Sequence, residues 1–205
     1  MVQVFERGST TATDFVTEIT YNARGQRESI AYGNYTKTTY TYDADRFWLT
    51  RLLTERADSP SHDDETLQDL RYTHDAVGNI TKIEDYAEET LFFANEQVEP
   101  TQEFEYDALY RLTNATGREK SNQTQSTPFY NEYAGTLGGI PASGDGYLGS
   151  NPVLRNYEQR YTYDEAGNIT EMKHLLGSSV EWKRGYLYAT DSNQLARTSV
   201  PTDDY

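Results

Sequence analysis

The chain has 205 residues, of which only 36% are hydrophobic, and a formal net charge of −15. An acidic balance of this size argues against nucleic-acid binding and against a polybasic membrane anchor, because both need clustered lysine and arginine. The chain has no cysteine, which excludes disulfides and thiol catalysis, and its 18 tyrosines are the main candidates for buried aromatic area.

The first part of the chain consists of a polar stretch followed by strand-like segments. We expect residues 1–14 to form a polar lead-in and residues 15–205 to form one β domain. Segments 16–21 and 36–42 alternate polar and apolar residues, which is typical of half-buried strands. The glycine and asparagine within residues 32–35 indicate a hairpin turn between strands.

The middle of the chain alternates between strand-like and loop-like composition. Residues 50–56 are compatible with a short helix or with a strand, and residues 57–66 are charged, contain proline and predict an exposed loop. The apolar residues 91–95 are expected to face inward. Residues 120–156 are rich in polar residues and then in glycine, which predicts a long loop insertion before hairpins resume at residues 157–199.

The stretch 70–83 contains the unit from which the rest of the chain is built. Asp75 suits the first position of a tight turn, because its carboxylate can accept hydrogen bonds from the backbone amides that follow. Gly78 comes where a type I turn with a bulge requires a positive φ, which glycine adopts without strain. Strand-forming residues on both sides complete the pattern of a β-hairpin.

This unit recurs along the chain, with tyrosine near the start of the turn and asparagine able to replace the aspartate. Arg46 and Tyr110 replace the glycine in two copies, and a weak copy occupies residues 188–195. The predicted turn residues are Tyr21, Asn22, Gly25, Tyr42, Asp43, Tyr72, Asp75, Gly78, Asn79, Tyr106, Asp107, Tyr163, Asp164, Gly167 and Asn168. The repetition predicts an all-β fold of serial antiparallel β-hairpins.

The Tyr-Asp-x-x-Gly-Asn-Ile/Leu unit resembles the signature of the RHS-repeat, or YD-repeat, family. The flanking sequences resemble the RHS part of SpvB-like and insecticidal toxin-complex B/C proteins at residues 67–72, 78–85, 106–112, 115–119 and 191–195. The resemblance extends from about residue 15 onward and implies a curved sheet that spirals as a segment of a hollow shell. It favours a strand at residues 50–56.

In that family the shell encloses a C-terminal effector, so the resemblance implies a non-enzymatic structural segment of a larger toxin-type protein. The implied partners are the remainder of the shell, an encapsulated effector polypeptide and other toxin-complex subunits, with no nucleic acid and no membrane insertion. Secretion is expected only as part of that larger protein, because the first residues lack the features of a signal peptide. The Asp-Pro-x-Gly-Leu motif that the family associates with self-cleavage does not occur in the sequence.

We predict no catalytic residue, no metal ligand and no cofactor. His62, His74 and His174 have no partner at metal-ligand spacing, so they are expected to be solvated or hydrogen-bonded surface imidazoles. The aspartates of the repeats resemble a row of acidic ligands, but capping of their own turns explains their fixed distance to the glycines. The glycine-rich stretch 135–149 lacks the Gly-Lys-Ser/Thr ending of a phosphate-binding loop.

Two other functions are open alternatives. A surface adhesion or carbohydrate-binding module would stack exposed aromatic residues such as Tyr35, Tyr40 and Tyr147 on sugar rings, whereas a shell needs inward-facing rows of tyrosine and leucine. An enzyme in loop 120–156 would need converging titratable side chains, and that loop offers Glu132 and Asp145 without histidine. A basic client that complements the acidic surface is a minor hypothesis.

Overall fold

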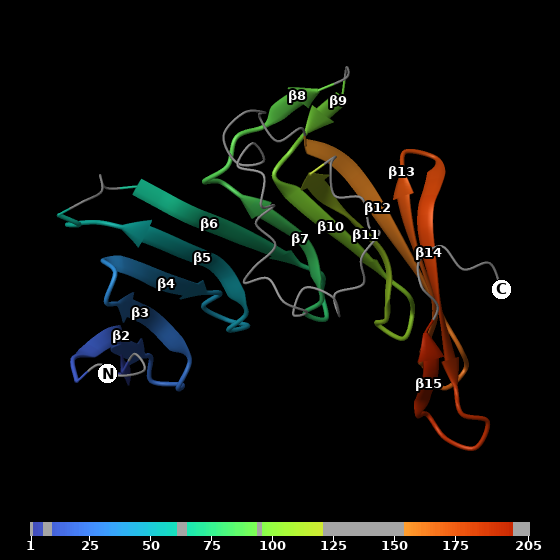
Figure 1. Ribbon diagram of the computed structural model, residues 1–205, viewed down its shortest axis with the longest axis horizontal. Helices are drawn as coiled ribbons and strands as arrows, with labels where there is room; N and C mark the ends of the chain where they lie inside the picture. The colour runs from blue at the N-terminus through green and yellow to red at the C-terminus, as the bar shows by residue number, and fades with distance from the viewer. Residues whose placement is uncertain (1, 6–9, 61–64, 94–95, 121–153, 199–205) are drawn as a thin grey trace. The chain divides into compact units, whose positions relative to one another are not determined.

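The computed structural model describes residues 2–5, 10–60, 65–93, 96–120 and 154–198. Every regular element in this part of the chain is a β-strand (Figure 1), which confirms the prediction of an all-β fold made of serial antiparallel hairpins. The described residues contain no helix with the length and apolar character needed to cross a membrane. The chain divides into two compact units, residues 1–89 (unit 1) and residues 90–205 (unit 2).

Unit 1 is an antiparallel sheet in which each strand pairs with the next strand in the sequence. Its strands are β1 (Val2–Phe5), β2 (Ala12–Tyr21), β3 (Arg27–Tyr32), β4 (Thr36–Tyr42), β5 (Leu49–Arg56), β6 (Glu65–His74) and β7 (Ile80–Asp85). This order needs no crossover connection, because neighbouring strands in space are also neighbours in sequence.

Unit 2 repeats the same meander and adds a small two-stranded sheet. The small sheet pairs β8 (Leu91–Phe93) with β9 (Glu96–Val98). The larger sheet contains β10 (Thr101–Tyr106), β11 (Leu112–Lys120), β12 (Leu154–Tyr163), β13 (Ile169–Leu176), β14 (Ser179–Tyr188) and β15 (Leu195–Thr198).

Several boundaries differ from the expectations. Residues 1–14, expected as a polar lead-in, contain β1 and the first residues of β2, which pair with each other. Residues 50–56 lie in β5, which confirms the strand that the family resemblance favours over a short helix. The inward orientation expected for residues 91–95 is wrong for Leu91 and Phe92, which are 38% and 78% exposed.

The expected loops fall partly outside the described residues. Of loop 57–66, residues 61–64 are not described and Glu65 already begins β6. Of the expected insertion 120–156, Lys120 ends β11 and residues 154–156 begin β12. Residues 121–153 lie outside the described part, so the insertion stays a prediction.

The register gives the larger sheet of unit 2 one aromatic face and one charged face. Tyr161 pairs with Met172, and His174 pairs with Trp182, so these side chains share a face. The residues that alternate with them are mostly threonine, lysine, arginine and glutamate. Burial raises the pKa of the Tyr161 and Tyr157 hydroxyls, with smaller electrostatic contributions from neighbouring groups. Tyrosine thus supplies much of the half-buried area.

Candidate functional site

The aspartates of the repeat turns bind the backbone of their own turns. Oδ1 of Asp75 accepts hydrogen bonds from the backbone N–H groups of Val77, Gly78 and Asn79 at 2.9, 2.8 and 2.9 Å. Its Oδ2 accepts a fourth from Nδ2 of Asn79 at 2.8 Å. Burial alone would raise the pKa of Asp75, but these donors outweigh it and hold the pKa below its usual value.

The other copies use the same arrangement. Asp164 accepts from the backbone N–H and from Nδ2 of Asn168 at 2.8 and 2.9 Å, and these bonds lower its pKa. Asp107 accepts from the backbone N–H of Arg111 at 3.0 Å and from its Nε at 2.7 Å. Asn22 takes the same role with an amide oxygen, which accepts from the N–H groups of residues 24 and 26. These oxygens are directed into their own turns and leave no row of free acidic ligands.

Three glycines hold the left-handed position of the turns. Gly25, Gly78 and Gly167 have φ angles of 78°, 103° and 91°. Tyr110 occupies this position in its turn with φ 61°. The turn that begins at Asp43 is one residue longer than expected, so Phe47 takes the positive φ, at 62°, and not Arg46.

The tyrosine that ends the strand before a repeat turn links consecutive hairpins. The hydroxyl of Tyr163 donates to the backbone carbonyl of Leu112 at 2.6 Å, and the hydroxyl of Tyr188 donates to the carbonyl of Ile169 at 3.0 Å. Tyr42 donates likewise to the carbonyl of Arg27 at 2.9 Å. Each acceptor is the first residue of the strand that follows the preceding turn. We call this contact the tyrosine link.

The copy at Asp75 departs from this pattern. His74 pairs with Ile80 as Tyr163 pairs with Ile169, so His74 holds the position of the linking tyrosine. The predicted Tyr72 lies within β6, two residues before that position. The centre of the His74 ring lies 5.2 Å from the centre of the Trp48 ring. This ring contact takes the place of the hydrogen bond that the tyrosine hydroxyl makes in the other copies. For Tyr42 and Tyr163 the sequence contains the signal for the link, a tyrosine directly before the aspartate, but it does not indicate the acceptor.

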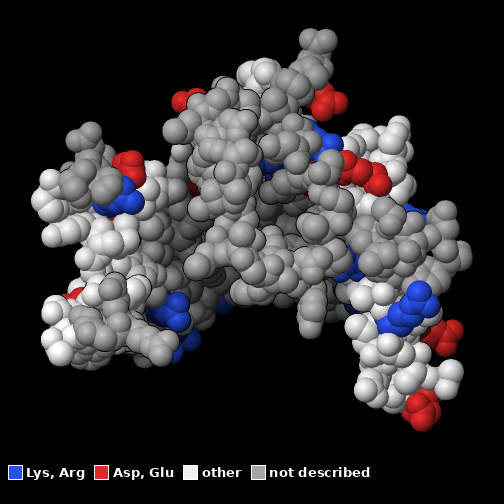
Figure 2. Space-filling view, viewed as in Figure 1, with Lys and Arg blue, Asp and Glu red and all other residues white. Residues whose placement is uncertain are grey.

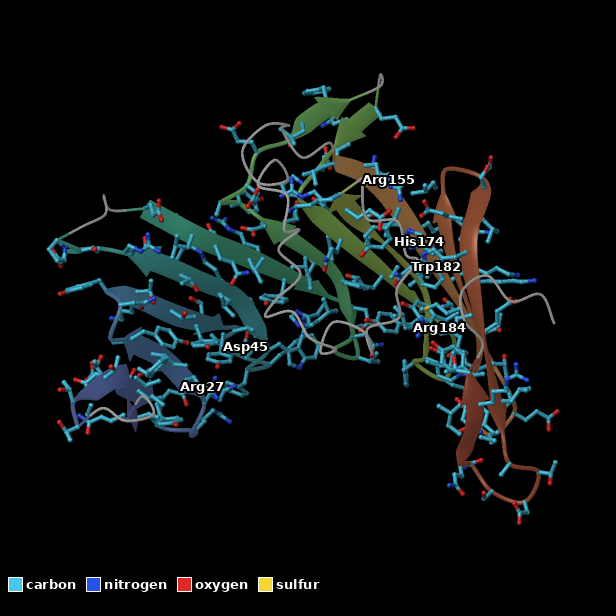
Figure 3. All side chains as sticks on the ribbon, in the orientation of Figure 1. Arg27, Asp45, Arg155, His174, Trp182 and Arg184 are labelled. Atoms are coloured by element: carbon cyan, nitrogen blue, oxygen red, sulfur yellow. The ribbon has the colours of Figure 1, made fainter. Side chains whose placement is uncertain are left out.

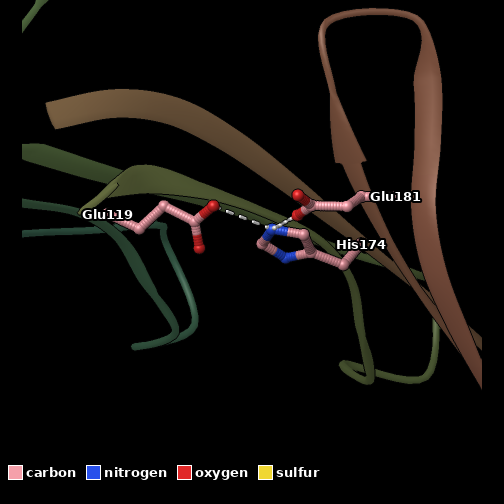
Figure 4. Close-up of side chains that lie close together, drawn as sticks. All are labelled: Glu119, His174 and Glu181. Carbon is pink, nitrogen blue, oxygen red and sulfur yellow. Dashed lines mark hydrogen bonds and ion pairs between the residues drawn. The ribbon is translucent and has the colours of Figure 1, made fainter. Parts of the chain in front are cut away.

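A second cluster surrounds His174 in unit 2 (Figures 3 and 4), which the sequence did not indicate. The expectation of a surface imidazole is wrong for His174, which is only 2% exposed. Its ring stacks between the rings of Tyr157 and Trp182. The ring centres lie 5.3 Å and 5.0 Å from the centre of the His174 ring, respectively. Its Nε2 lies 3.2 Å from Oε1 of Glu119 and 3.5 Å from Oε2 of Glu181. His62 lies outside the described residues.

A β-bulge brings Glu181 into this cluster. His174 pairs with Trp182 while Leu175 pairs with Val180, so Glu181 is the extra residue between them. A bulge lets two successive side chains point to the same side of a sheet. Arg155 then joins the two carboxylates, because its Nη2 lies 2.8 Å from Glu119 and 2.9 Å from Glu181. The network connects β11, β12, β13 and β14.

The chemistry of this cluster favours an ion-pair network over a metal centre. The ligand atoms of Glu119, His174 and Glu181 lie within 4.8 Å of one another, a separation that one cation can bridge. However, the Arg155 guanidinium already forms ion pairs with both carboxylates. In addition, Nδ1 of His174 is buried without a hydrogen-bond partner among the described residues, whereas a metal-bound imidazole usually donates its second N–H.

A pocket of about 360 Å³ lies beside the small sheet of unit 2. Gln97, Glu99, Thr101, Glu103 and Asn156 contribute to its lining. Nε2 of Gln97 donates to Glu99 at 2.7 Å, and Nδ2 of Asn156 donates to the carbonyl of Gln97 at 2.9 Å. Its lining contains no nucleophile paired with a base, so the pocket supports no catalytic assignment. On the face shown in Figure 2, described acidic and basic side chains are interspersed.

Comparison with known proteins identifies the class to which these repeats belong. No protein-family model matches the chain. The chain is 38% identical over 156 residues to toxin subunit YenC2 and 37% identical over 189 residues to toxin subunit YenC1, both of Yersinia entomophaga. These matches cover 76% and 92% of the chain, but the chain spans only 15% and 18% of the two toxin subunits.

Solved structures show the same likeness. The crystal structure of TcdB2-TccC3 matches 94% of the chain at 31% identity with a TM-score of 0.65. The Photorhabdus luminescens Tc holotoxin pore with the TccC3 mutation D651A matches 95% at 31% identity and the same TM-score. The chain covers 8% of either solved chain. The repeats and the fold define an RHS-repeat sheet. The chain belongs to the RHS-repeat family of insecticidal toxin-complex B/C proteins.

Proposed function

We propose that this chain is a non-enzymatic shell segment of a larger, secreted RHS-repeat toxin-type protein that encloses and carries a C-terminal effector polypeptide. The observation that carries the proposal is the match of nearly the whole chain to one stretch of toxin subunits and toxin-complex structures. Its partners would be the rest of its own shell, the enclosed effector and other toxin-complex subunits. The matched structures include TcdB2-TccC3 and a holotoxin pore.

The local structure supports a structural role. Side-chain oxygens of the repeat turns are used for capping, and the tyrosine links join one hairpin to the next, so the motif builds sheet. The buried histidine packs between two aromatic rings beside the ion pairs of Arg155. These features suit a wall that extends by adding hairpins. The predicted domain range, residues 15–205 with an insertion at 120–156, is part of this proposal.

Protease protection of the C-terminal region tests the proposal. In the complete polypeptide that carries this chain, the C-terminal region should resist a protease that rapidly digests the same region expressed alone. Deletion of the hairpin formed by β12 and β13 should expose it, whereas the surface substitution Glu165→Ala should not. Equal cleavage rates for the enclosed and isolated regions would refute enclosure.

A carbohydrate-binding module is the second candidate, and one observation favours it. Tyr35 is 52% exposed at a turn, as a sugar-stacking ring would be. Tyr40 is half-buried in β4, and Tyr147 lies outside the described residues. Binding to a glycan array that Tyr35→Ala abolishes would favour this function over the shell.

A further inference from the structure

Two aromatic residues occupy the left-handed turn position that glycine holds elsewhere. Phe47 has φ 62° and Tyr110 has φ 61°, against the positive φ angles of Gly25, Gly78 and Gly167. A bulky residue is strained in this region, because its β-carbon crowds the backbone. Such strain persists only where other contacts offset it, and it clusters at functional positions.

The strain at Phe47 is offset within unit 1. The guanidinium carbon of Arg24 lies 3.3 Å from the centre of the Phe47 ring, an arrangement that favours the aromatic side chain over glycine. The carbonyl of Phe47 also accepts a hydrogen bond from Nε2 of Gln26 at 2.8 Å. The side chain is half-buried. A contact within the described structure therefore favours an aromatic side chain at position 47.

No comparable ring contact favours an aromatic side chain at position 110 among the described residues. It is 60% exposed, and its ring makes no aromatic stacking or cation–π contact with the described part of the chain. The preceding Leu109 is 69% exposed. The turn itself is held by Asp107 through backbone amides, and this bonding would be the same with glycine at position 110. Two adjacent apolar side chains thus project from a strained turn.

Tyr35 shares the positive φ and is 52% exposed, which makes it the natural comparison. It follows Gly33 and Asn34, so its turn presents a single ring without an apolar neighbour. The side chain of Asn34 accepts a hydrogen bond from the hydroxyl of Thr36 at 2.6 Å and keeps this turn polar. The combination of strain, exposure and a second apolar side chain is found at Leu109 and Tyr110.

We propose that Leu109 and Tyr110 form a docking tip that packs against another stretch of RHS-repeat sheet in the same polypeptide. This inference rests on the proposed function. The matched stretch amounts to 15% and 18% of the toxin subunits, so most of a protein of that size lies outside it. The turns of serial hairpins lie at the ends of the strands, where a second strip of sheet can lie against them. The occupied surface would offer an apolar recess and an acceptor for the tyrosine hydroxyl.

Photocrosslinking from position 110 tests the contact directly. A photoreactive phenylalanine analogue placed at position 110 of the complete polypeptide should crosslink to residues outside 1–205 of the same molecule. The same analogue at Thr162, exposed on the charged face, is the matched control and should crosslink several-fold less. Crosslinks confined to a separate subunit, or no crosslink above the Thr162 control, would overturn the proposal.

The sign of a stability change gives an independent test in the same complete polypeptide. Relief of strain alone would make Tyr110→Gly raise the melting temperature. Loss of a docked ring should instead lower it, while Tyr110→Phe, which keeps the ring and loses only the hydroxyl contact, should lower it less. A rise on Tyr110→Gly would overturn the docking tip. Protease protection of the C-terminal region is measured separately, so failure of enclosure is distinguished from failure of this contact.

Discussion

The turn between β6 and β7 and the turn between β12 and β13 share the pattern Asp-x-x-Gly-Asn-Ile-Thr but are attached to the preceding hairpin differently. In the first, a side chain on Gly78 would meet the Trp48 ring at 3.0 Å, and His74 lies against the same ring. In the second, a β-carbon on Gly167 would meet no described atom within 4 Å, and Tyr163 provides a hydrogen bond to the preceding hairpin. The same local turn can therefore be joined to the preceding hairpin either by packing of aromatic rings or by a hydrogen bond.

The glycines should show the largest difference between the two turns. Gly167→Ala adds only the strain of a positive φ and should lower the free energy of unfolding by about 1 kcal/mol. Gly78→Ala adds crowding against Trp48 and should lower it by about 2–3 kcal/mol. Urea unfolding followed by the fluorescence of Trp48 in unit 1 and Trp182 in unit 2 measures both. Equal losses would mean that the ring of Trp48 moves aside freely.

Within unit 2, the hairpin formed by β12 and β13 is also joined to its neighbouring strands by the Arg155 network, which lies away from the turn. Arg155→Met would leave Glu119 and Glu181 near one another without their shared cation and should cost about 2 kcal/mol. Trp182 fluorescence during urea unfolding reports this loss. Because Arg155 occupies the carboxylates, zinc should not raise the melting temperature of the wild-type chain. A zinc-dependent rise that His174→Gln abolishes would establish a metal centre instead.

Loss of the tyrosine link should lower the free energy of unfolding by less than crowding at Gly78 or loss of the Arg155 network. Tyr163→Phe removes the hydroxyl that donates to Leu112 and should lower the free energy of unfolding by about 1 kcal/mol. Tyr186→Phe, on the same face, is the matched control and should change it by less than about 0.5 kcal/mol. If the two variants behave alike, packing of the ring and not the hydrogen bond joins these hairpins.

Acid should weaken both turns alike, because both aspartates have lowered pKa values in the folded chain. A depressed folded pKa contributes stability that is present above the unfolded value of about 3.9 and is lost as the pH falls through the folded pKa. Asp164→Asn should therefore make the urea midpoint less sensitive to pH between about 5 and 3, as should Asp75→Asn. An unchanged pH dependence in both variants would show that these carboxylates are not the groups that titrate.

The repeat pattern predicted the hairpins because turn formation is local. Asp75 and Gly78 are close enough in sequence for hydrogen bonding and backbone strain to fix their roles. The His174 cluster was missed because Glu119, Arg155 and Glu181 come from three different strands, and a bulge sets the position of Glu181. Spacing along the chain carries no signal for such a cluster.

Two errors have the same origin. Tyr72 was assigned to a turn because tyrosine is the expected residue, although register places His74 there. The repeat spacing places Arg46 at the glycine position. The φ angles show that the turn after Asp43 is one residue longer, so that Phe47 occupies this position. In both cases the element was predicted correctly and the position within it was not, because register depends on pairing with another strand.

The tyrosine link has a consequence for how such a chain can change. Its acceptor is a backbone carbonyl, and the residues that supply it are Arg27, Leu112 and Ile169, so a charged side chain and aliphatic ones serve equally. Because the hydrogen bond goes to the backbone of the preceding hairpin, it does not require a particular side chain there. Whole hairpins can therefore be duplicated, inserted or exchanged, and can diverge afterwards, without a matching substitution in the neighbour.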